Sequence, residues 1–318
     1  MELIISNISS IFLVAGIGLL ANKTGVLPMS ANKYLSALLI KVTCPCMVIT
    51  SISSNTLTDD TFAMSIQAIV CSALWFYFSG AIGFFLSKKV LRTSSDDQST
   101  YTIAFGSANN GFIGFPITLA IFGSSILYMM VLHNIAMAVF FMYSLAPLIV
   151  NMGSSDGKVN VKGVLTALAN PNILAAFIGF FLLFTGIRLP SPVFDCLDLV
   201  GSSTTALSML LVGLQLGECH LMTIIKNKSL LIMSLLKMTV IPALTFVVFH
   251  WLPVAVEVKV CMVFAASFPA AVAIVPVISE ENKDASLAAE IVALTTLISM
   301  AVIPAAATIL ISVYGISA

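Results

Sequence analysis

The stretch Asn109-Asn110-Gly111-Phe112-Ile113-Gly114-Phe115-Pro116 interrupts a segment that is otherwise apolar and long enough to cross a bilayer. Proline lacks an N–H group and clashes with the preceding turn, and glycine permits backbone angles that other residues avoid. A second stretch, Phe268–Pro276, places two prolines midway along another apolar segment. Lipid cannot satisfy the backbone groups that such breaks release, so breaks persist only where protein or a wet cavity surrounds them. A matched pair of interrupted spans indicates a substrate site.

The composition predicts an integral membrane protein. Of 318 residues, 59% are hydrophobic and 9% are charged, and the mean hydropathy is +1.08. A soluble domain carries about 25% charged residues. The 14 basic and 14 acidic residues give zero net charge, so lipid is the expected partner and nucleic acid is not. The first apolar run, Leu3–Ala21, is interpreted as a retained helix rather than a signal peptide.

Cysteine and acid–base patterns give no sign of a cofactor or of covalent chemistry. Most of the six cysteines fall inside apolar runs, and Cys44-Pro45-Cys46 is interpreted as packing rather than as a redox pair. Only Cys219-His220 has ligand-like spacing, and no second pair accompanies it. We therefore expect no metal site. No Ser/His/Asp or paired-carboxylate arrangement is visible, so we do not expect an enzyme.

Apolar runs bounded by charged or turn-rich segments predict an all-α protein with ten spans. The predicted spans are Leu3–Ala21, Asn32–Ser54, Thr61–Leu86, Ser99–Phe122, Ser125–Val150, Pro171–Ile187, Leu197–Leu216, Ser229–Leu252, Val258–Ile278 and Asp284–Tyr314. Ten lysines and arginines fall on one set of alternate loops with their flanking span ends, whereas only Arg188 and Lys259 fall on the other. The lysine-rich side is expected to be cytoplasmic, so both termini face outward.

The spans divide into two groups of five, residues 1–150 and 171–318. Because five is odd, the second group enters the membrane with the opposite polarity. The fourth span of each group carries the helix break. An inverted repeat with discontinuous helices at the midplane is typical of alternating-access carriers.

The broken helices predict a site for a small anion, most simply a carboxylate. Helix N-termini present free N–H donors and partial positive charge, so two converging ends could bind an anion without lysine or arginine. Asn109 and Asn110 add side-chain donors and acceptors, and Gly111 allows close backbone approach. Ser107 and Ser267 are further candidates.

Three ionisable side chains lie well inside predicted spans. Lys41 and Lys237 sit at similar depths, and we expect their long stems to reach the membrane surface; the alternative is a counter-charge for a passing anion. His133 is interpreted as a neutral, hydrogen-bonded packing residue, with proton coupling as the alternative. Sodium coupling through carbonyl and hydroxyl oxygens stays open.

The sequence resembles the auxin efflux carrier (AEC) family, which includes plant PIN auxin carriers and bacterial malonate or malate permeases. The run 109–116 is similar to the family's N-x4-G-x-P signature. Supporting matches are Pro45, Asn170-Pro171-Asn172, Leu207–Leu216 and Pro269 followed by Glu280-Glu281. The resemblance covers essentially the whole chain.

The resemblance implies a scaffold domain of spans 1, 2, 6 and 7 and a transport domain of spans 3–5 and 8–10. Substrate would bind between them where spans 4 and 9 cross. Asn109 matches the crossover asparagine, Pro116 and Pro269 match the two crossover prolines, and Pro45 matches a proline lining the path. Ala270 departs from the polar residue of plant carriers, which favours a small mono- or dicarboxylate over auxin. Related carriers are often dimers, and no motif here decides for or against a homodimer.

We interpret the chain as a secondary carrier of organic anions in a bacterial cytoplasmic membrane, working by an elevator-like shift. A sodium-coupled symporter of the bile-acid type is one alternative, because it shares this kind of crossover. A membrane sensor or sterol-binding receptor that kept the fold without transport is another.

Overall fold

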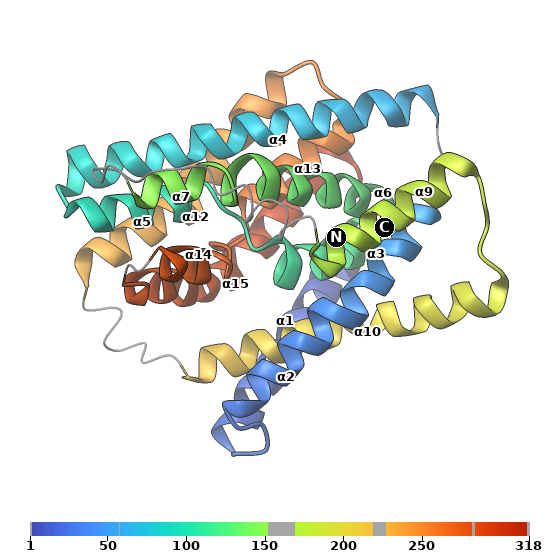
Figure 1. Ribbon diagram of the computed structural model, residues 1–318, viewed down its shortest axis with the longest axis horizontal. Helices are drawn as coiled ribbons and strands as arrows, with labels where there is room; N and C mark the ends of the chain where they lie inside the picture. The colour runs from blue at the N-terminus through green and yellow to red at the C-terminus, as the bar shows by residue number, and fades with distance from the viewer. Residues whose placement is uncertain (1, 57, 152–168, 219–226, 282–283, 317–318) are drawn as a thin grey trace.

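The computed structural model describes residues 2–56, 58–151, 169–218, 227–281 and 284–316, and every regular element in these ranges is helical (Figure 1). Four short elements, η1 to η4, are π-helical. The elements are α1 (Glu2–Lys23), α2 (Ser30–Leu38), η1 (Leu39–Thr43), α3 (Cys44–Ser53), α4 (Asp59–Phe85), η2 (Leu86–Leu91), α5 (Ser95–Phe105), η3 (Asn110–Gly114), α6 (Phe115–Ala136), η4 (Met137–Met142), α7 (Leu145–Val150), α9 (Pro171–Thr185), α10 (Ser191–Glu218), α12 (Lys228–Trp251), α13 (Val256–Ala266), α14 (Ile274–Glu280) and α15 (Ser286–Tyr314).

Local sequence explains where several helices begin and end. The Ser94 hydroxyl accepts a hydrogen bond from Asp97 N and starts α5, and the Asn170 side chain accepts one from Asn172 N and starts α9. Such side-chain caps satisfy donors that have no partner within the helix. At Gly186, with φ 68°, α9 ends in a left-handed conformation that glycine adopts without strain.

Gly123 divides α6 into two helices. Its backbone (φ 75°, ψ −169°) is not helical, and it falls between the predicted fourth and fifth spans. Only glycine adopts this region without strain, so the sequence allows the chain to turn sharply here. The predicted boundary between Phe122 and Ser125 is therefore confirmed as a break in the helix.

Within the described ranges, six helical stretches are long and apolar enough to cross a membrane. They are Ser30–Ser53, Asp60–Leu91, Ser95–Val150, Ser191–Gly217, Lys228–Trp251 and Ser286–Tyr314. Two shorter apolar helices are Ser10–Lys23 and Pro171–Thr185. Large apolar side chains such as Leu20, Phe62, Leu74 and Trp251 are exposed on the outside of the helices, as expected for a surface that meets lipid. The structure is thus that of an all-α integral membrane protein, and the ten-span count stays a prediction.

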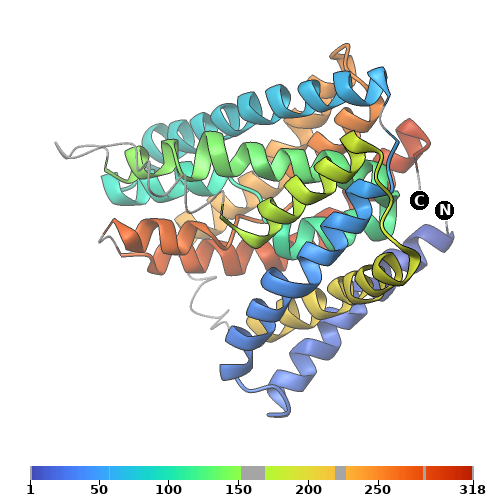
Figure 2. The same cartoon turned by 45° about the vertical axis from the view of Figure 1, so that its right-hand side comes forward.

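The helices pack in two groups. In one, α1 lies along α10, and α3 packs against α9 and α10; in the other, α4 packs against α5 and α6, and α12 against α13 and α15. Both views show α1, α2 and α10 together below and α4 and α5 above (Figures 1 and 2). The contact between α6 and α13 lies inside the second group, where both helices are largely buried.

Candidate functional site

The two predicted helix breaks are present, and they contact each other. Helix α5 ends at Phe105 and the chain turns helical again at Asn110, whereas α13 ends at Ala266 and α14 begins at Ile274. Asn109 N donates a hydrogen bond to Pro269 O at 2.9 Å. The two interrupted segments therefore meet through their main chains, and we call residues 106–110 and 267–273 together the crossover.

Side-chain hydroxyl groups form further hydrogen bonds at the crossover. Ser107 Oγ accepts from Ala271 N at 3.2 Å and donates to Ala104 O at 3.1 Å. Thr295 Oγ1, on α15, accepts from Ala270 N at 3.2 Å. Hydroxyl groups thus satisfy main-chain donors that the second break released, as a break at membrane depth requires.

The two asparagines hold different positions. The Asn109 side chain accepts from Phe112 N at 3.3 Å and caps η3. Asn110 is fully buried; its Nδ2 lies 3.4 Å from Asn134 Oδ1, and its own Oδ1 has no hydrogen-bond partner within the part of the chain that the structure describes. Asn110 therefore keeps an unused acceptor beside the break.

Several N–H groups at the two breaks are not free. Those of Asn109, Phe112, Ala270 and Ala271 are hydrogen-bonded within the protein. Two of these bonds, from Asn109 N to Pro269 O and from Ala271 N to Ser107 Oγ, join the breaks to each other, a geometry that the sequence alone does not reveal. Anion binding by the half-helix ends stays a prediction.

Tight packing fixes the crossing of the two segments. A Cβ atom added to Gly114 would lie 2.6 Å from Cε2 of Phe268, so only glycine leaves room for the ring. Pro116 stands in the first turn of α6, where a missing N–H group costs least. Pro269 precedes Ala270 in the second break and supplies the carbonyl that Asn109 N reaches.

One side of the first break faces α3 and α10. The Cys44 thiol lies 3.6 Å from Gly111 O, next to the half-buried Pro45. Ser208, on α10, donates to Phe112 O. No atom lies within 4 Å of the position that a Cβ on Gly111 would take, so there is open space here.

We predicted that Lys237 would reach the membrane surface, and the structure contradicts this prediction. Its side chain is 1% exposed, and its Nζ donates to Ser107 O at 2.9 Å. The prediction was wrong because the depth of a residue along a span does not determine which face of the helix its side chain occupies. A signal was available, since the buried positions of α12 recur every three or four residues and Lys237 falls among them. These positions are Leu230, Met233, Ser234, Lys237, Met238, Ile241, Pro242, Thr245 and Phe249.

The other candidates lie apart from the crossing contacts. Lys41 is exposed on η1, and its reach to the membrane surface stays a prediction. His133 is buried; its Nδ1 lies 2.8 Å from Ser72 Oγ, and its ring packs beside Phe76, consistent with a packing residue. Ser267, at the start of the second break, donates to Val263 O in the last turn of α13. Cys219-His220 lies outside the described residues.

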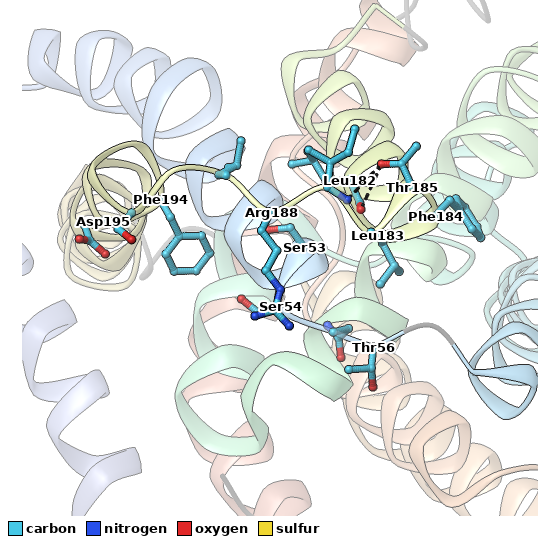
Figure 3. A pocket seen from close by; sticks show the side chains of 15 residues that line it. Ser53, Ser54, Thr56, Leu182, Leu183, Phe184, Thr185, Arg188, Phe194 and Asp195 are labelled. Carbon is cyan, nitrogen blue, oxygen red and sulfur yellow. Dashed lines mark hydrogen bonds between the residues drawn. The ribbon is translucent and has the colours of Figure 1, made fainter.

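A cavity of about 810 Å³ opens between the ends of α3 and α9 and the start of α10 (Figure 3). Figure 3 shows the Arg188 side chain pointing toward Ser54, with Asp195 farther along the cavity. The two charged side chains that line this cavity, Arg188 and Asp195, are exposed, and no crossover residue lines the cavity. The crossover, with its buried and interlocked polar groups, is therefore the better candidate.

Comparison with known proteins agrees with an integral membrane protein. A family model described as membrane transport protein matches residues 3–306. The chain belongs to this family. The resemblance to auxin efflux carriers is thereby confirmed, and this member of the membrane transport protein family is a transporter and not an enzyme.

Two proteins similar to this chain are named as transporters. An uncharacterized transporter of Methanocaldococcus jannaschii is 23% identical over 302 residues, which cover 90% of this chain and 92% of the relative. An uncharacterized transporter of Methanothermobacter thermautotrophicus is 23% identical over 300 residues, covering 93% and 94%. Both matches extend over nearly the full lengths of the proteins compared.

Proposed function

We propose that this transporter carries small organic anions with a carboxylate group, and that it binds them beside the crossover. Substrate would enter the open space at Gly111, between the first break and the Cys44-Pro45 segment of α3. Asn110 would orient the ligand from one side. Pro116, in the first turn of α6, and Pro269, in the second break, would shape the site.

The observation that carries this proposal is the buried side-chain nitrogen of Lys237. A buried charge is costly unless it is paired, and intramembrane charges mark substrate or ion pathways. Among the described residues, the hydrogen-bond acceptor of Lys237 is the neutral carbonyl of Ser107, and no carboxylate is paired with it. An arriving carboxylate would supply the missing negative charge.

The movement we propose is an elevator-like shift of one helix group against the other. The first group, α1 to α3 with α9 and α10, would be the scaffold, and the remaining helices would carry the crossover. This division is supported by the packing, because each group has its most extensive contacts within itself. The helices would form ten spans in two inverted groups of five, with Gly123 separating the fourth span from the fifth.

A binding measurement with matched ligands tests the substrate class. Purified protein is unfolded by heat with acetate, malonate, malate or citrate, and with malonamide as the uncharged counterpart of malonate. We expect at least one carboxylate to raise the unfolding midpoint in a saturable manner, because ligands that bind the folded form stabilise it. Malonamide should have no effect. Equal stabilisation by malonate and malonamide, or none by any carboxylate, would contradict the proposal.

A measurement of substrate uptake then distinguishes a carrier from a receptor that binds without transport. The stabilising carboxylate, carrying a radiolabel, is offered to proteoliposomes that contain the protein and to protein-free liposomes. We expect saturable uptake in the first only. Saturable binding without uptake would instead favour a sensor.

A further inference from the structure

Four oxygen atoms at or beside the crossover accept hydrogen bonds from N–H groups. The acceptors, each with its donor, are Ser107 O with Lys237 Nζ, Ser107 Oγ with Ala271 N, Thr295 Oγ1 with Ala270 N, and Pro269 O with Asn109 N. The four separations lie between 2.9 and 3.2 Å. Three of the donors are main-chain amides, and the fourth is the side-chain nitrogen of Lys237.

Carbonyl and hydroxyl oxygens are also the groups that hold a hard cation in a protein. In carriers with broken helices, unwound carbonyls and helix C-terminal ends provide such a site. Here Ser107 follows the C-terminal end of α5, where the helix dipole is negative. The group that approaches this end is the side-chain nitrogen of Lys237, which is attached to α12 and cannot enter and leave as a free ion does.

We propose that Lys237 is protonated and that its ammonium is the permanent cation of the crossover, which takes the place of a free sodium ion, so that transport is independent of sodium. The role in transport rests on the function proposed above, whereas occupation of the cation position rests on the geometry alone. A sodium ion beside Ser107 O would be repelled by the ammonium and would compete with it for the same oxygen.

The test measures thermal unfolding of the full-length protein in sodium chloride and in choline chloride at equal ionic strength. The wild type should unfold at the same temperature in both salts. Lys237→Ala removes the ammonium and frees Ser107 O, so we expect sodium, and not choline, to raise the midpoint of this variant in a saturable manner. Lys237→Arg keeps a cation and should remain indifferent to sodium. Lys41→Ala is the matched control, because it removes an exposed intramembrane lysine.

Two results would overturn this inference. One is a saturable, sodium-specific stabilisation of the wild type, which needs no variant to fold. The other is a folded Lys237→Ala protein that responds to the two salts identically. If Lys237→Ala does not fold, the wild-type and Lys237→Arg measurements decide: sodium-specific stabilisation of either protein contradicts the inference, and indifference of both supports it.

The same assay distinguishes this inference from the proposed function. Carboxylates added in choline chloride should stabilise the wild type as much as they do in sodium chloride. Stabilisation that appears only with sodium would reject the permanent cation and leave the anion carrier intact. An absence of carboxylate stabilisation in both salts would reject the anion site, while the comparison of salts would still decide about Lys237.

Discussion

Asn109 serves the crossover with both its main chain and its side chain. Its N–H group reaches Pro269 O, and its side-chain oxygen caps η3 through Phe112 N. A change at this position therefore affects local stability as well as charge. Loss of a helix cap typically costs about 0.5–2 kcal/mol, so an alanine variant alone would mix the two effects.

Asn109→Asp separates charge from capping. Aspartate caps a helix as well as asparagine does, but an ionised aspartate would place a negative charge beside the proposed anion site. We expect the protein to fold and the apparent affinity for the transported carboxylate to fall at least about tenfold, equivalent to about 1.4 kcal/mol. Uptake as a function of substrate concentration measures this change.

Asn109→Ser is the matched control for that experiment. Serine keeps a capping oxygen and adds no charge, so its affinity should stay much closer to that of the wild type. Equal affinities of the wild type and Asn109→Asp would remove the anion site from this break.

At the scale of single residues, the two lysines inside predicted spans show most clearly what sequence-based prediction could not determine. Lys41 and Lys237 have similar depths and received the same interpretation, yet one is exposed and the other is buried against the first break. The difference depends on helix rotation and on which neighbour covers each face. Asn109 was easier to place because its role depends on local chain geometry, which the adjacent glycines and proline reveal.

Among the elements, η3 and the second break are held together by the contact between Gly114 and Phe268. A methyl group on Gly114 would force the aromatic ring to move. We expect Gly114→Ala to destabilise the protein by about 1–3 kcal/mol, the usual effect of overpacking. Chemical denaturation in detergent can measure the change.

Phe268→Leu in the same chain should recover part of the loss caused by Gly114→Ala. The smaller side chain leaves room for the methyl group, so the two substitutions should be strongly non-additive. Additive effects would mean that this contact does not fix the crossing.

The pairing of α1 with α10 depends on glycines where the two backbones approach. A Cβ atom on Gly18 would lie 2.9 Å from Leu210 Cα, whereas a Cβ on Gly16 would meet nothing within 4 Å. Small residues allow this kind of close helix contact in membranes. We expect Gly18→Val to lower the unfolding midpoint by several degrees and Gly16→Val, on the same helix, to have little effect. The opposite ranking would contradict the packing of α1 on α10.

The positions of the helices were largely predictable, because long apolar runs and their charged ends are local features. The predicted starts of the eighth and tenth spans lie within two residues of the starts of α12 and α15. The π-helical turns and the hydrogen bonds between breaks were not predictable. They arise where distant segments pack, and neither composition nor period encodes that packing.

For the whole molecule, the proposed shift requires the crossover to move past α10. Ser208, on α10, contacts Phe112 beside the break, so cysteines at these two positions in a chain without other cysteines could be oxidised to a disulfide. We expect oxidation to stop carboxylate uptake in proteoliposomes and reduction to restore it. Each single-cysteine variant should transport under both conditions. Undiminished uptake by the fully cross-linked protein would show that the two groups need not slide past one another.

The main-chain hydrogen bond between Asn109 and Pro269 also constrains how the protein is made. Ribosomes deliver the first break to the membrane long before the second, 160 positions later, has been synthesised. Until then, the polar backbone around Ser107 and Asn109 has none of its partners from the later half and must be shielded by water, by the insertion machinery or by another protein. Biogenesis therefore has a vulnerable interval that ends when the C-terminal half arrives, and nascent chains stalled within it would be natural targets for membrane quality control.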